Sequence, residues 1–279
     1  MMQRYREQSR FSDPGPYAEL LSPLPAAVPA DLPALMSIVR NVIVHYGASG
    51  IGFTGDRLAE IDSRWAEKIL AVDQGRFPMP LAHPRPEASR VVGCCRDFAL
   101  LTVAALRHHG VPARVRVGFA PYLREDWNCD HAVAEYWNGT RWVLADPQLD
   151  PEQYPFNTAD LPQFMTAAQA WDAHRRGLID ADTYGVDPSL PFKGHQFLLD
   201  SVLLELAHRQ RDEVLLWDQW GAITDRVADE LANLLLAADR GDAAAERALT
   251  DRYSTDPSLR LTTRVHCMSP SGFDGWVTV

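Results

Sequence analysis

The stretch Gly93-Cys94-Cys95-Arg96-Asp97-Phe98-Ala99 places two adjacent cysteines where a strongly helical segment begins. Apolar residues of this segment recur at helical spacing: Phe98, Leu101, Ala105 and Leu106. Gly110-Val111-Pro112 is a stop signal for the helix. The amino terminus of a helix favours negative charge, so a thiol there is easily converted to the nucleophilic thiolate. The stretch therefore predicts a reactive cysteine on the first turn of a buried helix.

A predicted β-hairpin downstream carries the two other groups that such a thiol needs. His131 opens an alternating run over 131–137, and Asp146 closes a second run over 141–146. Asn138-Gly139 between the runs is a strong hairpin signal. Because 131 lies about as far before the turn as 146 lies after it, we expect the two strand ends to be neighbours. An aspartate beside a histidine can hold the imidazole in the tautomer that a general base requires.

Four segments form a pattern along the chain: Gly93 to Ala99, Leu106-Arg107 with Gly110 to Arg114, His131-Ala132 with Glu135, and Trp142 with Asp146-Pro147. Together they resemble the core of the transglutaminase-like superfamily. The resemblance implies a papain-like fold, in which a helix packs on an antiparallel sheet. It also implies that Cys95 rather than Cys94 is the nucleophile, that His131 is its base, and that Asp146 orients His131.

The rest of the chain predicts an α+β protein in three parts. Residues 1–30 are proline-rich and form an irregular arm, 31–155 form the catalytic core, and 156–279 form a mainly helical extension packed on it. A strand is expected over 113–119 and a loop over 75–86. Helices are expected over 31–45, 55–72, 166–176, 195–217 and 225–240.

Composition excludes several classes of partner. The 279 residues are 46% hydrophobic and carry a formal net charge of -10, without a cluster of Lys or Arg, which argues against nucleic acid and against an anionic membrane surface. No apolar run approaches the length of a membrane span, and residues 1–7 are polar, so we expect a cytoplasmic location. The four cysteines do not resemble a disulfide framework.

Three alternative roles involve residues near the site. Cys129 and His131 lie two apart on a strand and could bind a metal ion with Cys94 or Cys95, but no second Cys-x-x-Cys pair exists, so we predict neither a metal nor a cofactor. Cys129 could also form a disulfide with Cys95 under oxidation. Trp65 could donate to an oxyanion, although its place in an apolar helical pattern favours core packing.

The predicted function is thiol-dependent acyl chemistry on an amide or a related carbonyl, through an acyl-enzyme thioester. Hydrolysis of a peptide or a small amide is the first expectation. The alternative is acyl transfer to an amine, including transglutaminase-type or amide-forming reactions. A non-catalytic binding protein on the same fold is the hypothesis from a different class, and the presence of Cys95, His131 and Asp146 argues against it.

Overall fold

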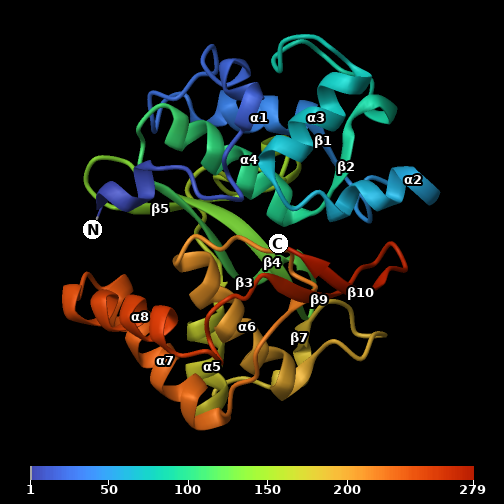
Figure 1. Ribbon diagram of the computed structural model, residues 1–279. Coiled ribbons are helices and arrows are strands. Elements are labelled where there is room, and N and C mark those ends of the chain that lie inside the picture. The colour runs from blue at the N-terminus through green and yellow to red at the C-terminus, as the bar shows by residue number, and fades with distance from the viewer. Residues whose placement is uncertain (1) are drawn as a thin grey trace.

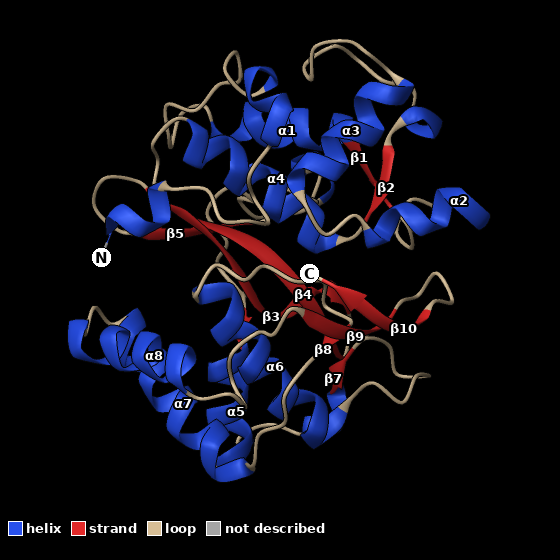
Figure 2. Ribbon diagram, in the orientation of Figure 1, coloured by secondary structure: helices blue, strands red, loops and turns tan. Residues whose placement is uncertain are grey.

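The computed structural model describes residues 2–279 and has the predicted α+β architecture. Its main sheet is antiparallel along the order β5-β4-β3-β6, and β7 pairs with β4 in parallel. Figure 2 shows this sheet across the middle of the molecule, with helices above and below it. The strands are β3 (Ala113–Arg124), β4 (Trp127–Trp137), β5 (Trp142–Ala145), β6 (Met165–Thr166) and β7 (Tyr184–Gly185).

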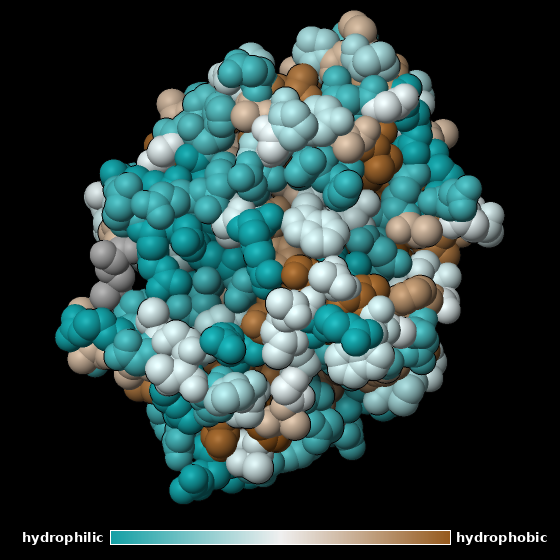
Figure 3. Space-filling view, in the orientation of Figure 1, coloured by the Kyte–Doolittle hydropathy of each residue, from teal (hydrophilic) through white to brown (hydrophobic). Residues whose placement is uncertain are grey.

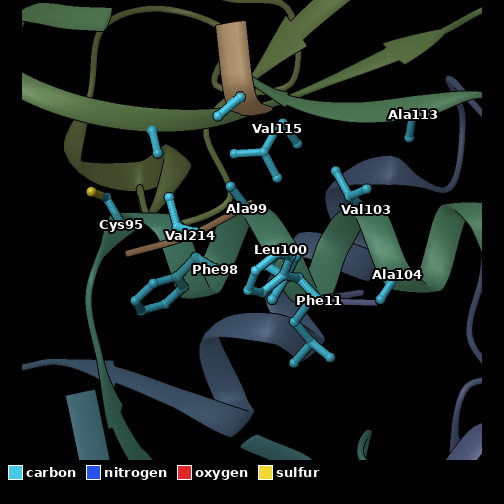
Figure 4. Close-up of a cluster of buried hydrophobic side chains, with 14 of the residues drawn as sticks. Phe11, Cys95, Phe98, Ala99, Leu100, Val103, Ala104, Ala113, Val115 and Val214 are labelled. Carbon is cyan, nitrogen blue, oxygen red and sulfur yellow. The ribbon is translucent and has the colours of Figure 1, made fainter. Parts of the chain in front are cut away.

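The helix that begins at the cysteine pair is the centre of the core. α4 (Cys95–His108) is buried at every position except its last and packs against β3 and β4. A helix that is buried on all sides must be apolar all round or pair its polar groups internally. Figure 4 shows Phe98, Leu100 and Val103 among buried side chains, with Cys95 at the end of the helix and its sulfur directed away from them. The predicted helix packed on an antiparallel sheet is therefore confirmed.

Two of the helices predicted in the first half of the chain differ from those in the structure. α1 (Leu32–Val42) ends three residues before the expected end at 45, because Ile43–His45 form β1, which pairs in parallel with β2 (Val91–Gly93). The β-branched run at 42–44 favours a strand, and this preference outweighs the helical spacing of the apolar residues.

The helix expected over 55–72 is wrong as a single element. It is broken into α2 (Gly55–Leu58), a 3₁₀ turn (Ala59–Asp62) and α3 (Ala66–Arg76). At the break the buried guanidinium of Arg64 donates two hydrogen bonds, of 3.0 and 2.7 Å, to the carboxylate of Asp218. This long-range pair holds the chain out of the helical conformation, which local spacing does not reveal.

The predicted hairpin is present, with a longer turn than the Asn-Gly signal suggests. Trp137 pairs with Trp142, so residues 138–141 form the turn. The Asn138 side chain accepts hydrogen bonds from the N–H groups of Thr140 and Arg141, both at 2.9 Å, and Gly139 has a positive φ of 101°. Positive φ is the backbone conformation that glycine adopts without strain.

The second half is mainly helical and ends in a small sheet. Its helices are α5 (Ala167–Arg175), α6 (Gly194–Arg209), α7 (Asp225–Asp239) and α8 (Ala243–Thr255). α6 ends eight residues before the expected end at 217, because Arg211 has a φ of 70° and turns Glu213 inward to meet Arg107. The small antiparallel sheet has the order β10-β9-β8, with β8 (Asp218–Gln219), β9 (Arg264–Met268) and β10 (Asp274–Thr278). Figure 1 shows these helices below the main sheet.

The amino-terminal arm wraps the core and is anchored by buried side chains, among them Tyr5, Phe11 and Leu21. The boundaries at 30 and 155 stay a prediction. On the face drawn in Figure 3, hydrophobic and neutral residues gather at the centre, where Figure 1 places β9 and β10. Trp276 of β10 is 60% exposed. Among residues 2–279, no helix combines the length and the apolar character that crossing a bilayer requires.

Candidate active site

Cys95 is fixed at the first position of α4 by the residues around it. Cys94 is the N-cap, in an extended conformation, and its N–H donates to the Asp97 carboxylate at 2.9 Å. A Cβ at Gly93 would lie 2.9 Å from both Asp97 and Ile43, so only glycine lets β1 approach this turn. The first-turn N–H groups of a helix have no acceptor within the helix, and they favour an anion beside them.

His131 and Asp146 meet as the hairpin predicted. β4 carries His131, and Asp146 follows the last residue of β5. The Nε2 atom of His131 lies 2.7 Å from Oδ2 of Asp146. The same oxygen accepts a 2.9 Å hydrogen bond from the Tyr122 hydroxyl, and Oδ1 accepts one of 3.1 Å from the Gln148 N–H. Three donors therefore hold the Asp146 carboxylate in place.

The thiol of Cys95 and the imidazole of His131 interact directly. A hydrogen bond from Cys94 and the charge of His131 lower the pKa of Cys95 well below its usual value, although burial opposes the shift. Burial alone would lower the pKa of His131, but the charges of Asp146 and Cys95 outweigh it and raise that pKa well above its usual value. The directions of both shifts favour a thiolate beside an imidazolium. Because Nε2 of His131 faces Asp146, Nδ1 is the nitrogen left for the sulfur.

Cys94 has the opposite character from its neighbour. Its hydrogen bond to Cys95, together with burial and the charge of Asp97, raises the pKa of the Cys94 thiol well above its usual value. A protonated Cys94 can then donate to the Cys95 thiolate. The pKa shifts of the two adjacent cysteines therefore have opposite directions, which favours Cys95 over Cys94 as the thiolate.

The site is nearly closed to solvent. Cys95 is 6% exposed, His131 2%, and Asp146 is fully buried. Tyr122 packs edge-on against His131, with ring centroids 6.3 Å apart, and Phe156 lies 5.2 Å from Tyr122. Low exposure strengthens every electrostatic interaction within the cluster, because water screens it less.

Several residues beside this cluster were not predicted from the sequence. They are Tyr122, His45, Tyr46 and Asp130. Burial and the charge of Cys95 raise the pKa of Asp130 to about 7. Tyr122 lies beyond the end of the strand that the sequence predicts over 113–119, and His45 lies at the end of a predicted helix. Only the observed strand register shows that either residue is near the site. The β-branched run before His45 was the one local signal available.

The structure also describes Cys129 and Trp65, for which the sequence left other roles open. Cys129 is a free thiol whose pKa burial raises to about 11. Trp65 stacks on Phe11, with ring centroids 6.4 Å apart, and packs against the core. Within residues 2–279, no three His, Cys, Asp or Glu side chains converge in an arrangement that could hold a metal ion.

Comparisons with known proteins find a similarity in the core of the chain. The family model of the transglutaminase-like superfamily matches residues 59–147. A solved structure of a candidate cysteine protease from Cytophaga hutchinsonii is 19% identical, with a TM-score of 0.37. The match covers 53% of this chain and 42% of that one, so the chain spans less than half of the other protein. No curated protein matches this sequence.

The family match contains Cys95, His131 and Asp146, and it also contains α4 and the hairpin that bring them together. The match to this superfamily supports thiol-dependent catalysis in general terms. Residues 59–147 of this chain are therefore similar to the transglutaminase-like superfamily.

Proposed function

We propose that this protein catalyses acyl transfer from an amide or a related carbonyl through a thioester on Cys95. The observation that carries the proposal is the contact between Cys95, at the start of α4, and His131, whose other nitrogen lies 2.7 Å from Asp146. His131 accepts the thiol proton and later gives it to the leaving nitrogen, while Asp146 holds the imidazole.

Hydrolysis is the favoured outcome, with water resolving the thioester. The acyl group is small or slender, because only 6% of Cys95 is exposed and its partners are more deeply buried. Acyl transfer to an amine remains the alternative, since the same three residues serve both reactions. A site that excludes water favours an amine acceptor.

The test uses two reagents on the purified protein. Iodoacetamide near neutral pH should alkylate Cys95 faster than Cys267, whose pKa burial raises to about 11. A p-nitrophenyl ester should give a burst of nitrophenol and an acyl-enzyme that mass spectrometry locates on Cys95. Both reactions should be lost in His131→Ala. Equal labelling of Cys95 and Cys267 would contradict an activated thiol.

The acceptor is identified in the same assay by adding amines. If the acyl-enzyme decays at the same rate with and without a primary amine, and the free acid is the product, the protein is a hydrolase. If decay accelerates with amine and an amide accumulates, it is an acyltransferase. A protein that forms no acyl-enzyme with any ester or thioester tried, although Cys95 is alkylated, would contradict the proposed function.

A further inference from the structure

His45 lies beside the turn from which Cys95 projects, held there by the parallel pair β1–β2 (Figure 1). His45 is in register with Gly93, two residues before Cys95, and the Tyr46 N–H donates to the Gly93 carbonyl at 3.0 Å. Neighbouring strands are roughly 4.8 Å apart, so the histidine side chain starts within reach of the first turn of α4. The mutual electrostatic effects of His45 and Cys95 agree with this closeness.

The hydrogen bonds of His45 fix which ring nitrogen carries the proton. Nδ1 accepts from the N–H groups of Gly47 and Ala48, at 3.0 and 3.1 Å. A nitrogen that accepts hydrogen bonds bears no proton, so the neutral ring is protonated at Nε2. Burial lowers the pKa of His45, and the nearby His131 adds to that effect, whereas Cys95 and Asp146 act in the opposite direction. At neutral pH the ring is therefore an uncharged N–H donor.

The Nε2–H group has no protein partner. Among residues 2–279, no side chain or carbonyl accepts a hydrogen bond from it, whereas Tyr46 stacks on the ring face with centroids 5.0 Å apart. His45 is half-buried, so this donor is open to a ligand. A donor that is fixed in tautomer and stacked, but left without an acceptor, is preorganised for an oxygen that the structure does not contain.

We propose that His45 is a catalytic residue of the acyl transfer, donating Nε2–H to the carbonyl oxygen of the substrate as that oxygen becomes negative. The second donor is the backbone N–H of Cys95, on the first turn of α4. This assignment rests on the proposed function, because it requires a carbonyl at Cys95. His45 stays neutral throughout and gives a hydrogen bond, not a proton.

The step balances without any further reactant. The Cys95 thiolate forms a C–S bond, and the π pair of the carbonyl moves to its oxygen, where His45 and the backbone N–H bind it. The oxygen then re-forms the C=O bond, the C–N bond breaks, and the imidazolium of His131 gives its proton to the departing nitrogen. Removing one preorganised oxyanion donor costs on the order of 10²–10³-fold in rate.

A structural role for His45 is the competing explanation, since its Nδ1 anchors the turn at Gly47 and Ala48. Two amide variants separate the roles. In His45→Asn the side-chain oxygen can replace Nδ1 as the acceptor for the turn, but no donor reaches the position of Nε2. In His45→Gln the longer side chain places an amide N–H near that position, and the acceptor for the turn is lost. The donor role predicts that Gln preserves acylation better than Asn.

The readout compares two reactions of the same thiolate. Alkylation by iodoacetamide displaces a halide and forms no oxyanion, whereas acylation by a p-nitrophenyl ester passes through one. We expect His45→Asn to slow acylation by about 100-fold or more and to change alkylation less than about twofold. His45→Gln should recover part of the acylation rate. His131→Ala, the reference, should slow both reactions.

Other outcomes overturn the assignment. If His45→Asn acylates at the wild-type rate, or loses both reactions in equal measure, His45 acts on the turn or on the thiolate and not on an oxyanion. The same conclusion follows if Asn preserves acylation better than Gln. A wild-type protein that is alkylated on Cys95 but never acylated would overturn the proposed function, and the role of His45 with it.

Discussion

Two clusters of buried charge lie on the same pair of strands, and they differ in how completely their charges are paired. Near the middle of the β3–β4 pair, His131 lies opposite Gly118 and shares a cluster with Cys95 and Asp146. Toward one end of the pair, Arg114 lies opposite Glu135, beside Arg116. The second group, together with the acidic residues that bind it, is called here the arginine network: Arg114, Arg116, Glu135, Glu205, Arg209, Asp239 and Glu246.

The arginine network leaves little capacity for a ligand. Arg116 donates four hydrogen bonds, of 2.7 to 3.1 Å, to Glu135, Glu205 and Asp239, although its Nε is unpaired. Its partners come from β4, α6 and the last residue of α7, so the network joins the sheet to the helices of the second half. At the cysteine, by contrast, the thiolate has few partners and His45 keeps a free donor. Burial of charge alone therefore does not indicate chemistry, whereas an unpaired donor that is open to a ligand beside a candidate nucleophile does.

The largest expected effect is on activity at the incompletely paired cluster. Cys95→Ala should abolish acyl-enzyme formation, a loss on the order of 10⁴-fold or more, because no other thiolate replaces it. Its melting temperature should stay at or above that of the wild type, since a buried charge is removed. Cys267→Ser is the control and should acylate normally. If the Cys95→Ala variant is still acylated, on Cys94, the proposed difference in reactivity between the two cysteines is contradicted.

The next effect is on stability at the arginine network. Arg116→Ala removes a shared partner from the carboxylates of Glu135, Glu205 and Asp239 and should lower the free energy of unfolding by about 3–5 kcal/mol. Denaturant unfolding measures this change. Arg226→Ala, at a side chain that is 86% exposed, is the matched control and should unfold like the wild type. In Arg116→Ala that remains folded, iodoacetamide should still label Cys95 at the wild-type rate.

The pH dependence of acylation tests the charge state of the pair. The thiolate forms as pH rises through the lowered pKa of Cys95, and the imidazolium is lost as pH rises through the raised pKa of His131. Amide turnover should therefore be flat around neutral pH and fall about tenfold per pH unit beyond each limit. Alkylation needs only the thiolate, so it should persist on the alkaline side. An acid limit near pH 8.5 would mean an unperturbed thiol.

A smaller effect is expected at Asp146, whose carboxylate is fully hydrogen-bonded like the carboxylates of the arginine network. Tyr122→Phe removes one of the two hydrogen bonds to Oδ2 of Asp146. The loss should slow acylation by about tenfold, as expected for one hydrogen bond to a charged group. Tyr154→Phe, whose ring is 5.5 Å from Phe156, is a matched control without that bond and should change the rate little. Equal rates in both variants would show that Asp146 needs no second donor.

The local signals of the sequence were sufficient for the elements of the site. The helix start at Cys95 followed from apolar spacing, and the hairpin followed from alternation and Asn138-Gly139. Each of these signals spans fewer than about fifteen residues and reflects the period of one element. His131 and Asp146 could be placed side by side because they lie at similar distances before and after the predicted hairpin turn.

Where local spacing predicted the wrong secondary structure, contacts between residues far apart in the sequence explain the difference. The strand at Ile43–His45 exists because β2, far along the chain, pairs with it. The break before α3 exists because Arg64 meets Asp218, and the early end of α6 exists because Glu213 turns inward to Arg107. A buried ion pair can outweigh the few tenths of a kcal/mol by which one residue prefers a helix.

By itself the sequence determined the class of fold, the helix that begins at the cysteines, and the order of the three candidate catalytic residues. Only the tertiary structure decided which charges are fully paired, and it alone brought Tyr122 to Asp146 and His45 to the first turn of α4. The physical reason is that periodicity reports the environment of one element. The partner of a buried polar group depends on strand register and on packing between elements distant in sequence.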